Sequence, residues 1–131
     1  MPTSEERSEI AGRVTVIGER TILMREIPVQ SPASVNSMFD RLESLADGWE
    51  RFCYVADLTE AARPDAETRA TLKRRVLRVS PRVAHVAIVV GNNLLMRAMA
   101  RLVAVSMGLT SVSTHATRGE AIAEAARGLE R

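Results

Sequence analysis

The chain holds few of the side chains that most often act as nucleophiles or metal ligands: one cysteine, Cys53, and two histidines, His85 and His115. A reactive thiol needs an exposed, electropositive setting, whereas Cys53 stands in an apolar run that is typical of a buried strand. A zinc site needs a second ligand at a short spacing, and neither histidine has one. These residues are therefore expected to be structural, and no catalytic residue, metal site or cofactor is predicted.

Asp57 directly follows the apolar run 52–56, and a carboxylate at the end of a buried strand is a feature of receiver domains. Those domains also need an acidic pair after the first strand to hold Mg²⁺, and a lysine after the last strand. Here Ile17 and His115 occupy those positions. Glycine-rich phosphate-binding motifs are absent as well. The sequence therefore supports neither a receiver domain nor a nucleotide site.

Cations are concentrated on a predicted helix that begins at Pro64 and Asp65 and ends before Ser80, with no acidic residue from Thr68 to Arg82. The basic residues are Arg69, Lys73, Arg74, Arg75, Arg78 and Arg82. One interpretation is a solvated face whose arginines pair with acidic residues of the first half of the chain. The other is a surface for an anionic partner. An aromatic content of 3% argues against nucleic acid and leaves an acidic protein as the favoured anion.

The next predicted helix, residues 94–107, is apolar around most of its axis, and its only polar residues are Arg97, Arg101 and Ser106. One apolar face would suffice for packing on a sheet. The excess, which includes Met96 and Met99, predicts a second burial. A homodimer, a protein partner, an apolar ligand and burial under the C-terminal helix all remain open.

Charge is sorted along the chain although the formal net charge is only +2. Residues 1–67 hold seven basic and 13 acidic residues, a net charge of −6, and residues 68–131 hold 11 and three, a net charge of +8. This asymmetry indicates either an anionic partner or two halves that meet face to face in one fold.

Strand and helix patterns alternate, and they predict an α/β fold with a mostly parallel central sheet of about five strands, an antiparallel edge and about four helices. The first two strands flank a turn at 18–20, and Ser34 is the expected N-cap of the first helix. The predicted strands are 13–17, 21–26, 52–56, 83–90 and 111–115, and the predicted helices are 35–46, 64–79, 94–107 and 118–129.

A chain of 131 residues is long enough for one domain, which we place at residues 10–131. Residues 1–9 are polar and acidic, unlike a secretory signal, and are expected to form a short flexible arm. A single cysteine gives no support for an oxidising compartment, and no apolar run is long enough to span a bilayer. A cytoplasmic location is expected.

The order of these elements and two short segments resemble a STAS domain, specifically the SpoIIAA-like anti-sigma-factor antagonists. Residues 54–59 (YVADLT) are similar to the family's strand that ends in Asp-Leu-Ser, and residues 65–68 (DAET) fall where the family has Asp-Ser-Ser-Gly at a helix start. The resemblance covers residues 13–129 and includes Met107-Gly108-Leu109 and the segment 118–122. It implies the STAS fold.

The resemblance also implies a regulatory loop in which a phosphorylatable serine controls partner binding. Carried over by position, this loop consists of Asp57, Thr59, Asp65, Glu67 and Thr68. The family's two serines fall on Ala66 and Glu67, so the phosphoacceptor is missing. Glu67 either imitates a fixed phosphorylated state or is an ordinary first-turn acid, and Thr68 is the nearby hydroxyl that could replace the serine.

The function that the resemblance implies is that of a non-enzymatic module that binds a kinase-like or anti-sigma-like protein in bacterial signalling. We expect the partner surface to include Arg69, Lys73, Arg74, Arg75, Arg78, Met96 and Met99. Some diverged STAS-like domains are similar to CRAL-TRIO lipid-binding folds. The alternative is therefore a carrier or sensor of a small apolar or lipid ligand held against the helix 94–107.

Overall fold

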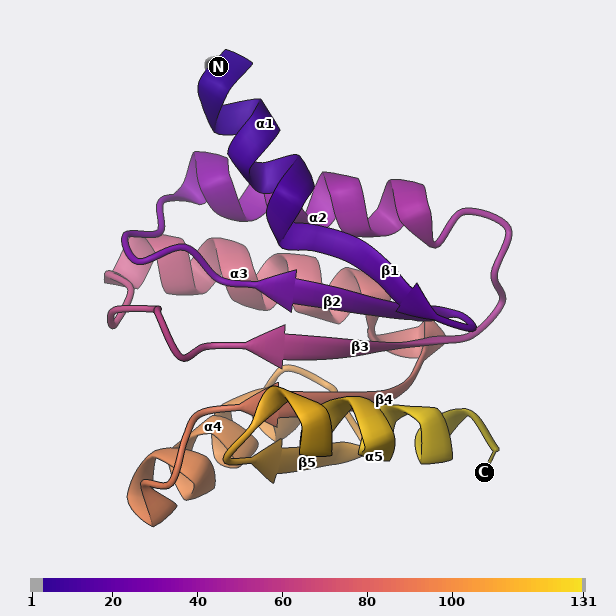
Figure 1. Cartoon of the computed structure of the whole chain (residues 1–131). Coiled ribbons are helices and arrows are strands. Elements are labelled where there is room, and N and C mark those ends of the chain that lie inside the picture. Colours follow the sequence, from indigo (N-terminus) through magenta and orange to yellow (C-terminus); the bar gives the residue numbers. More distant parts are fainter. Residues whose placement is uncertain (1–3, 131) are drawn as a thin grey trace.

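The computed structural model describes residues 4–130, which form a five-stranded sheet with helices on both faces (Figure 1). The strands are β1 (Val14–Gly18), β2 (Thr21–Arg25), β3 (Phe52–Asp57), β4 (Val83–Val89) and β5 (Val112–His115). The helices are α1 (Ser4–Arg13), α2 (Pro32–Leu45), α3 (Ala66–Val79), α4 (Leu94–Ser106) and α5 (Arg118–Glu130), and a 3₁₀ turn, Ser80–Arg82, follows α3. The predicted α/β class, the mixed sheet and the order of the predicted elements are confirmed.

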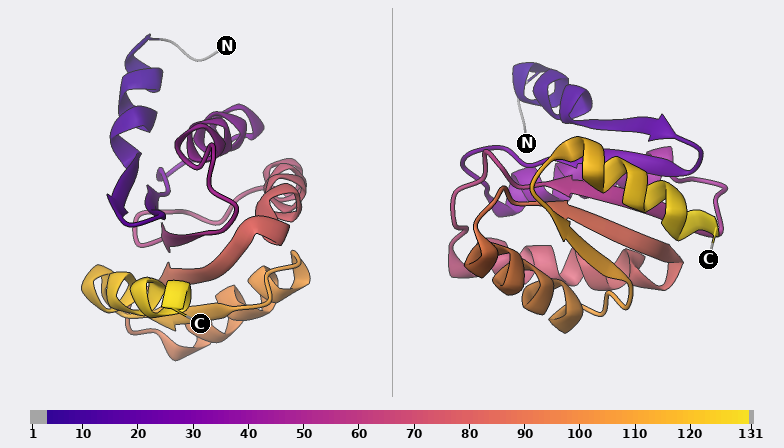
Figure 2. Two further views of the ribbon diagram at one scale, coloured as in Figure 1. Left: turned by 90° about the vertical axis from the view of Figure 1, so that its right-hand side faces the viewer. Right: turned by 60° about the horizontal axis from the view of Figure 1, so that its bottom comes forward.

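The strands lie in the sheet in their sequence order, β1 to β5. β1 pairs antiparallel with β2, and the other pairs are parallel. Because right-handed crossovers that advance in one direction place their helices on the same side of a sheet, α2, α3 and α4 share one face. α5 lies on the opposite face, as Figures 1 and 2 show. The carboxyl ends of the parallel strands therefore meet at one edge, where Asp57 aligns with Val89, and Val89 with His115.

Two apolar clusters separated by the sheet form the core. The larger cluster packs α2 and α3 on the sheet and includes Phe39, Leu42 and Phe52, all of which are buried. The smaller one packs α5 on the opposite face through Ala121 and Ala125. β3 is buried on both sides, which explains why its sequence is continuously apolar rather than alternating.

α2 begins three residues earlier than the sequence pattern predicts. Ser31, not Ser34, is the N-cap: its hydroxyl accepts a hydrogen bond from the Ser34 amide, and the Ser34 hydroxyl accepts one from the Ser31 amide. Pro32 is the first helical residue, where the missing amide hydrogen costs nothing. The predicted helix starts after this proline, although the first turn of a helix tolerates proline.

α1 is the element that the sequence analysis missed. A flexible arm was expected over residues 1–9, but the chain is helical from Ser4, while residues 1–3 lie outside the described residues. Ile10 is buried in the larger cluster, and the Arg13 guanidinium donates a hydrogen bond to the carbonyl of Glu26. The last turn of α1 is therefore attached to the domain.

α5 approaches β4 so closely that a side chain at Gly128 would not fit. A Cβ atom there would lie 2.5 Å from the Cβ of His85.

Because α5 lies on the face opposite α4, it does not cover α4. Burial under the C-terminal helix therefore does not explain why α4 is so apolar.

Candidate partner-binding surface

Asp57 is buried at the carboxyl edge of the sheet and does not present a free carboxylate. One oxygen accepts hydrogen bonds from the amide and the hydroxyl of Thr59, at 3.0 and 2.6 Å. The other accepts from the Arg118 guanidinium, with Nε at 3.0 Å and Nη2 at 2.9 Å. Burial alone would raise the pKa of Asp57, but the hydrogen bonds from Thr59 and the charge of Arg118 together lower it below its usual value. Asp57 therefore connects β3 to the start of α5.

The other residues of the predicted regulatory loop occupy different environments. Asp65 is the N-cap of α3 and accepts a hydrogen bond from the Thr68 amide at 2.8 Å, which lowers the pKa of Asp65. Thr68 is completely buried, and its hydroxyl has no hydrogen-bond partner. Glu67 and Thr59 are exposed. In this structure the hydroxyl of Thr68 is thus inaccessible to a kinase, whereas Thr59 lies at the surface.

The basic residues of α3 divide into two groups. Arg75 is buried between α3 and α2, where it pairs with Asp40 and Glu43 and donates to Asn36. Arg78 is exposed but also pairs with Glu43, at 3.0 Å. These arginines connect the basic second half of the chain to the acidic first half, which is one of the two interpretations of the charge pattern. Their guanidinium groups face α2.

The remaining three cations of the predicted set are exposed on α3: Arg69, Lys73 and Arg74. Arg69 also donates a hydrogen bond to the carbonyl of Pro64 at 2.8 Å. Leu77, which is exposed as well, lies on the same helix. Beyond Glu67, the outer surface of α3 is therefore basic, and Leu77 is its large exposed apolar side chain.

α4 exposes a continuous apolar surface. We call it the α4 face, and it consists of Leu94, Leu95, Met96, Met99, Leu102, Val103 and Val105, whose exposed fractions range from 48% to 74%. Of the thirteen helical residues only Ala104 is buried. Arg97 fixes the helix to β5 by donating to the carbonyl of Thr114 at 2.8 Å. Monomeric proteins rarely expose contiguous apolar patches of this kind, and such patches mark interaction sites.

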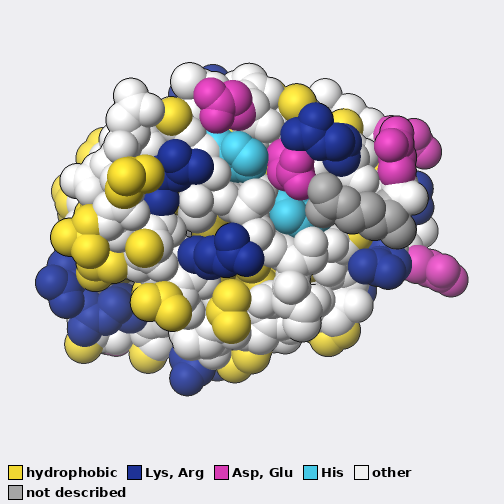
Figure 3. Space-filling view, turned by 90° about the horizontal axis from the view of Figure 1, so that it is seen from below, with side chains coloured by type: hydrophobic (Ala, Val, Ile, Leu, Met, Phe, Trp, Pro, Cys, Tyr) yellow, Lys and Arg dark blue, Asp and Glu magenta, His cyan; other side chains and the backbone are white. Residues whose placement is uncertain are grey.

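Figure 3 shows how the charges lie around the α4 face. Hydrophobic side chains gather at the left of this view, where α4 lies, and Lys and Arg side chains stand among them. The acidic side chains of the view lie outside this patch. The electrostatic setting of the α4 face is consequently positive.

The face of the sheet under α5 carries a hydrogen-bonded chain that the sequence analysis did not identify. His85 contacts the hydroxyls of Ser111 and Ser113 at 2.6 and 2.7 Å, and Ser113 in turn contacts His115 at 2.7 Å. Glu120 approaches the other ring nitrogen of His115 to 4.0 Å. Burial, opposed by Glu120 and Glu124, lowers the pKa of His115. Both ring nitrogens of His85 are satisfied, which agrees with a structural role for this residue.

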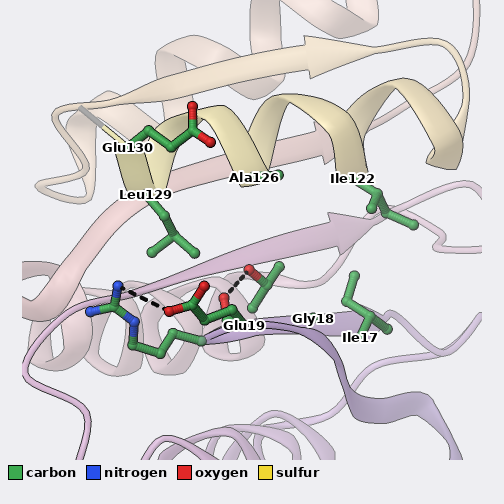
Figure 4. Close-up of a pocket in the computed structure, with 9 residues that line it drawn as sticks. Ile17, Gly18, Glu19, Ile122, Ala126, Leu129 and Glu130 are labelled. Atoms are coloured by element: carbon green, nitrogen blue, oxygen red, sulfur yellow. Dashed lines mark hydrogen bonds and ion pairs between the residues drawn. The ribbon is translucent and has the colours of Figure 1, made fainter.

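A groove of about 380 Å³ lies between the β1–β2 turn and α5 (Figure 4). Ile17, Ile122 and Leu129 point into it, and Glu19 and Arg20 form an ion pair of 3.8 Å at one end. This groove is on the opposite side of the sheet from α4. The alternative interpretation places an apolar ligand against the helix 94–107, where the structure has the open α4 face, and this groove lies elsewhere.

Among residues 9–130, whose side chains the structure describes, no three side chains of the metal-ligating types are close enough together to bind a metal ion. No helix in the same part of the chain is long and apolar enough to cross a membrane.

Comparison with known proteins defines the fold. The sequence matches no family model and no curated protein. A solved structure that is similar to the chain is that of an uncharacterised protein of the DUF3478 family from Shewanella loihica, which has a SpoIIAA-like fold. The TM-score is 0.73 at 14% sequence identity, over 86% of this chain and 91% of that one. The strand order, the helices and this likeness together show that the chain has a diverged SpoIIAA-like fold.

Proposed function

We propose that the protein is a non-enzymatic cytoplasmic docking module that binds a protein partner through the α4 face. The observation that carries this proposal is the exposure of seven large apolar side chains on one helix. Leaving such a surface in water is unfavourable by about 25 cal/mol for each Å² of apolar area, so a partner that covers it is strongly favoured. The two methionines on the face, Met96 and Met99, adapt their shape readily, as is common at binding surfaces.

The SpoIIAA-like fold supports a regulatory partner of the kinase-like or anti-sigma-like kind, and the loop between β3 and α3 lies at the edge of the sheet where α4 begins (Figure 1). Thr59 is the exposed threonine of that loop, and its hydroxyl donates to Asp57. Regulation by phosphorylation is not required for the proposal, because the α4 face is exposed irrespective of this loop.

Replacement of two leucines by serine, Leu95→Ser together with Leu102→Ser, is expected to weaken binding of the partner more than tenfold. These side chains are 69% and 71% exposed and stand seven residues apart on one line of α4. Full burial of each leucine contributes about 1.5–3 kcal/mol, and tenfold in affinity is about 1.4 kcal/mol. Affinity purification with tagged wild-type and variant protein, followed by titration with the recovered partner, measures the loss.

The matched control is Val16→Ser. Val16 is 47% exposed and lies on β1, at the end of the sheet away from β5, on which α4 packs. Its replacement leaves binding unchanged under the proposal. Thermal unfolding of all variants is expected to remain within a few degrees of wild type, since exposed side chains contribute little to stability. Equal retention of every captured protein by wild type and by the leucine variant contradicts the proposal.

A second candidate function is the binding of a small apolar or lipid ligand, and the groove between the β1–β2 turn and α5 is the observation that favours it. Its apolar residues are Ile17, Ile122, Ala126 and Leu129. Native mass spectrometry of protein purified from cells is expected to reveal an adduct that disappears in Ala126→Trp, which fills the groove. A spectrum with the bare mass alone removes this candidate.

A further inference from the structure

α3 and α4 lie on the same face of the sheet and run in the same direction, because each returns from the carboxyl edge in a right-handed crossover. Their C-terminal ends are close together. A Cβ atom at Gly108, just after α4, would lie 3.0 Å from the side chain of Leu77 and 3.3 Å from that of Ser80. The two helices therefore face the same side of the molecule and approach each other at their C-terminal ends.

Each of the two helices carries a row of side chains that leads to this approach. On α3, Arg69, Lys73 and Leu77 are four residues apart and form the row that leads to Gly108. On α4, Met96, Met99 and Val103 form the row that leads to Met107, which is buried against the core. One row is mainly cationic and the other is apolar.

The positive charge of α3 and α4 favours one kind of binding partner over another. No aspartate or glutamate occurs from Thr68 to Gly119, a stretch that contains nine Lys and Arg residues, all of α4, and all of α3 except its first two residues, Ala66 and Glu67. A second copy of the chain would bring two positive surfaces together, which is unfavourable. A partner with acidic side chains next to an apolar stripe complements both rows.

We propose that the docking partner presents an amphipathic helix with an apolar stripe and with Asp and Glu on one flank, and that this helix lies along the side of α4 that faces α3. The proposal rests on the docking function of the α4 face. The apolar stripe covers Met96, Met99 and Val103, and the acidic flank lies beside Arg69 and Lys73. A helix suits the site because helix recognition uses apolar anchors spaced three and four residues apart, as the α4 row is.

A defined probe tests the charge preference: a labelled synthetic peptide that forms a helix with a leucine stripe flanked by glutamates, and its twin with lysines in place of the glutamates. Fluorescence anisotropy with the whole protein measures both affinities. The acidic peptide is expected to bind at least tenfold more tightly than the lysine peptide. The difference is expected to shrink at high salt, because exposed charges are screened.

The charge-reversal variant Arg69→Glu with Lys73→Glu is expected to invert this preference, so that the lysine peptide binds more tightly. The matched control is Arg74→Glu. Arg74 is also exposed on α3, but its side chain points about 100° around the helix from that of Lys73. It is expected to keep at least half of the preference for the acidic peptide. Because all three side chains are exposed, these variants fold.

Three results overturn the inference: equal affinity of wild type for the two peptides, a preference that Arg69→Glu with Lys73→Glu leaves unchanged, and binding to vesicles of phosphatidylglycerol without binding to the acidic peptide. A concentration-dependent dimer that Leu102→Ser abolishes, again without peptide binding, also overturns it. Failure of the proposed function gives a different result: the protein then captures its partner equally well with and without the side chains of Leu95 and Leu102.

Discussion

Replacement of Arg75 by alanine is expected to lower the free energy of unfolding by about 3 kcal/mol, because it removes one side of a largely buried ion pair. The Arg75 guanidinium donates to Asp40 at 2.8 Å and to Glu43, and it lies 5.8 Å from the centre of the Phe39 ring. It also donates to the carbonyl of Asn36. Without it, the half-buried Glu43 keeps only the exposed Arg78 as a partner, and α3 loses its main polar contact with α2.

Urea denaturation followed by circular dichroism measures this loss as a lower midpoint with an unchanged slope. The matched control is Arg74→Ala, since Arg74 is the preceding arginine of α3 and is exposed. This change is expected to alter stability by less than about 0.5 kcal/mol. Equal midpoints for the two variants contradict the assignment of Arg75 to the α2–α3 interface.

The position of Arg75 between α2 and α3 also determines which variants are suitable for testing partner binding. Reversal of its charge would place a carboxylate against Asp40 and Glu43 and would unfold the interface between α2 and α3. A loss of binding in such a variant would not locate a partner. Arg69, Lys73 and Arg74 are exposed, so changes at these three positions test the surface itself.

The order of the elements could be predicted because each strand and helix carries its own period of apolar residues. β3 and β4 are continuous apolar runs, and α2 repeats apolar residues three and four apart. α1 escaped prediction because it is polar and acidic, and the attachment that the structure describes is in its last turn, at Ile10 and Arg13. Its attachment depends on partners remote in sequence.

A signal for the burial of Arg75 and Thr68 was present in the sequence. Both residues lie on the stripe of α3 that continues to Val79, at spacings of three and four residues through Thr71. A charged residue on a buried stripe is expected to have a partner on the neighbouring helix. The predicted set grouped all the cations of α3 by type, whereas their position around the helix separates those that face α2 from those that face solvent.

The hydrogen-bonded chain from Ser111 through His85 and Ser113 to His115 could not be predicted in the same way. It depends on the register of β4 and β5, which pairs Val86 with Val112 and Val89 with His115. Periodicity within a strand gives no information on that register. The sequence also left open whether α4 is exposed. That depends on whether α5 packs over α4 or on the opposite face of the sheet, and the sequence pattern does not decide between the two.

Glu26 lies at the carboxyl end of β2 and is the carboxyl group whose burial has the largest expected consequence. It is 6% exposed, and burial raises its pKa to about 7, although a hydrogen bond from Gln30 and the charge of Arg13 oppose the shift. The charge of Glu26 also contributes, after burial, to a pKa of Tyr54 well above its usual value. The folded state therefore binds a proton on Glu26 at pH values where the unfolded chain has released it.

This difference makes the folded protein less stable as the pH rises. Since the pKa of Glu26 is higher in the folded state than the unfolded value of 4.5, its stabilising contribution is complete below about pH 4.5 and is lost by about pH 7. A shift of about 2.5 pKa units corresponds to about 3 kcal/mol.

Glu26→Gln, whose amide oxygen can still accept from Gln30, is expected to be more stable than wild type by about that amount at about pH 8 and to match it near pH 4.5. Thermal unfolding across this pH range measures the effect as a difference of roughly 10 °C at the alkaline end. Glu50→Gln, at an exposed loop position, is expected to follow the wild-type curve, and parallel curves for Glu26→Gln and wild type would show that Glu26 is charged in the folded protein.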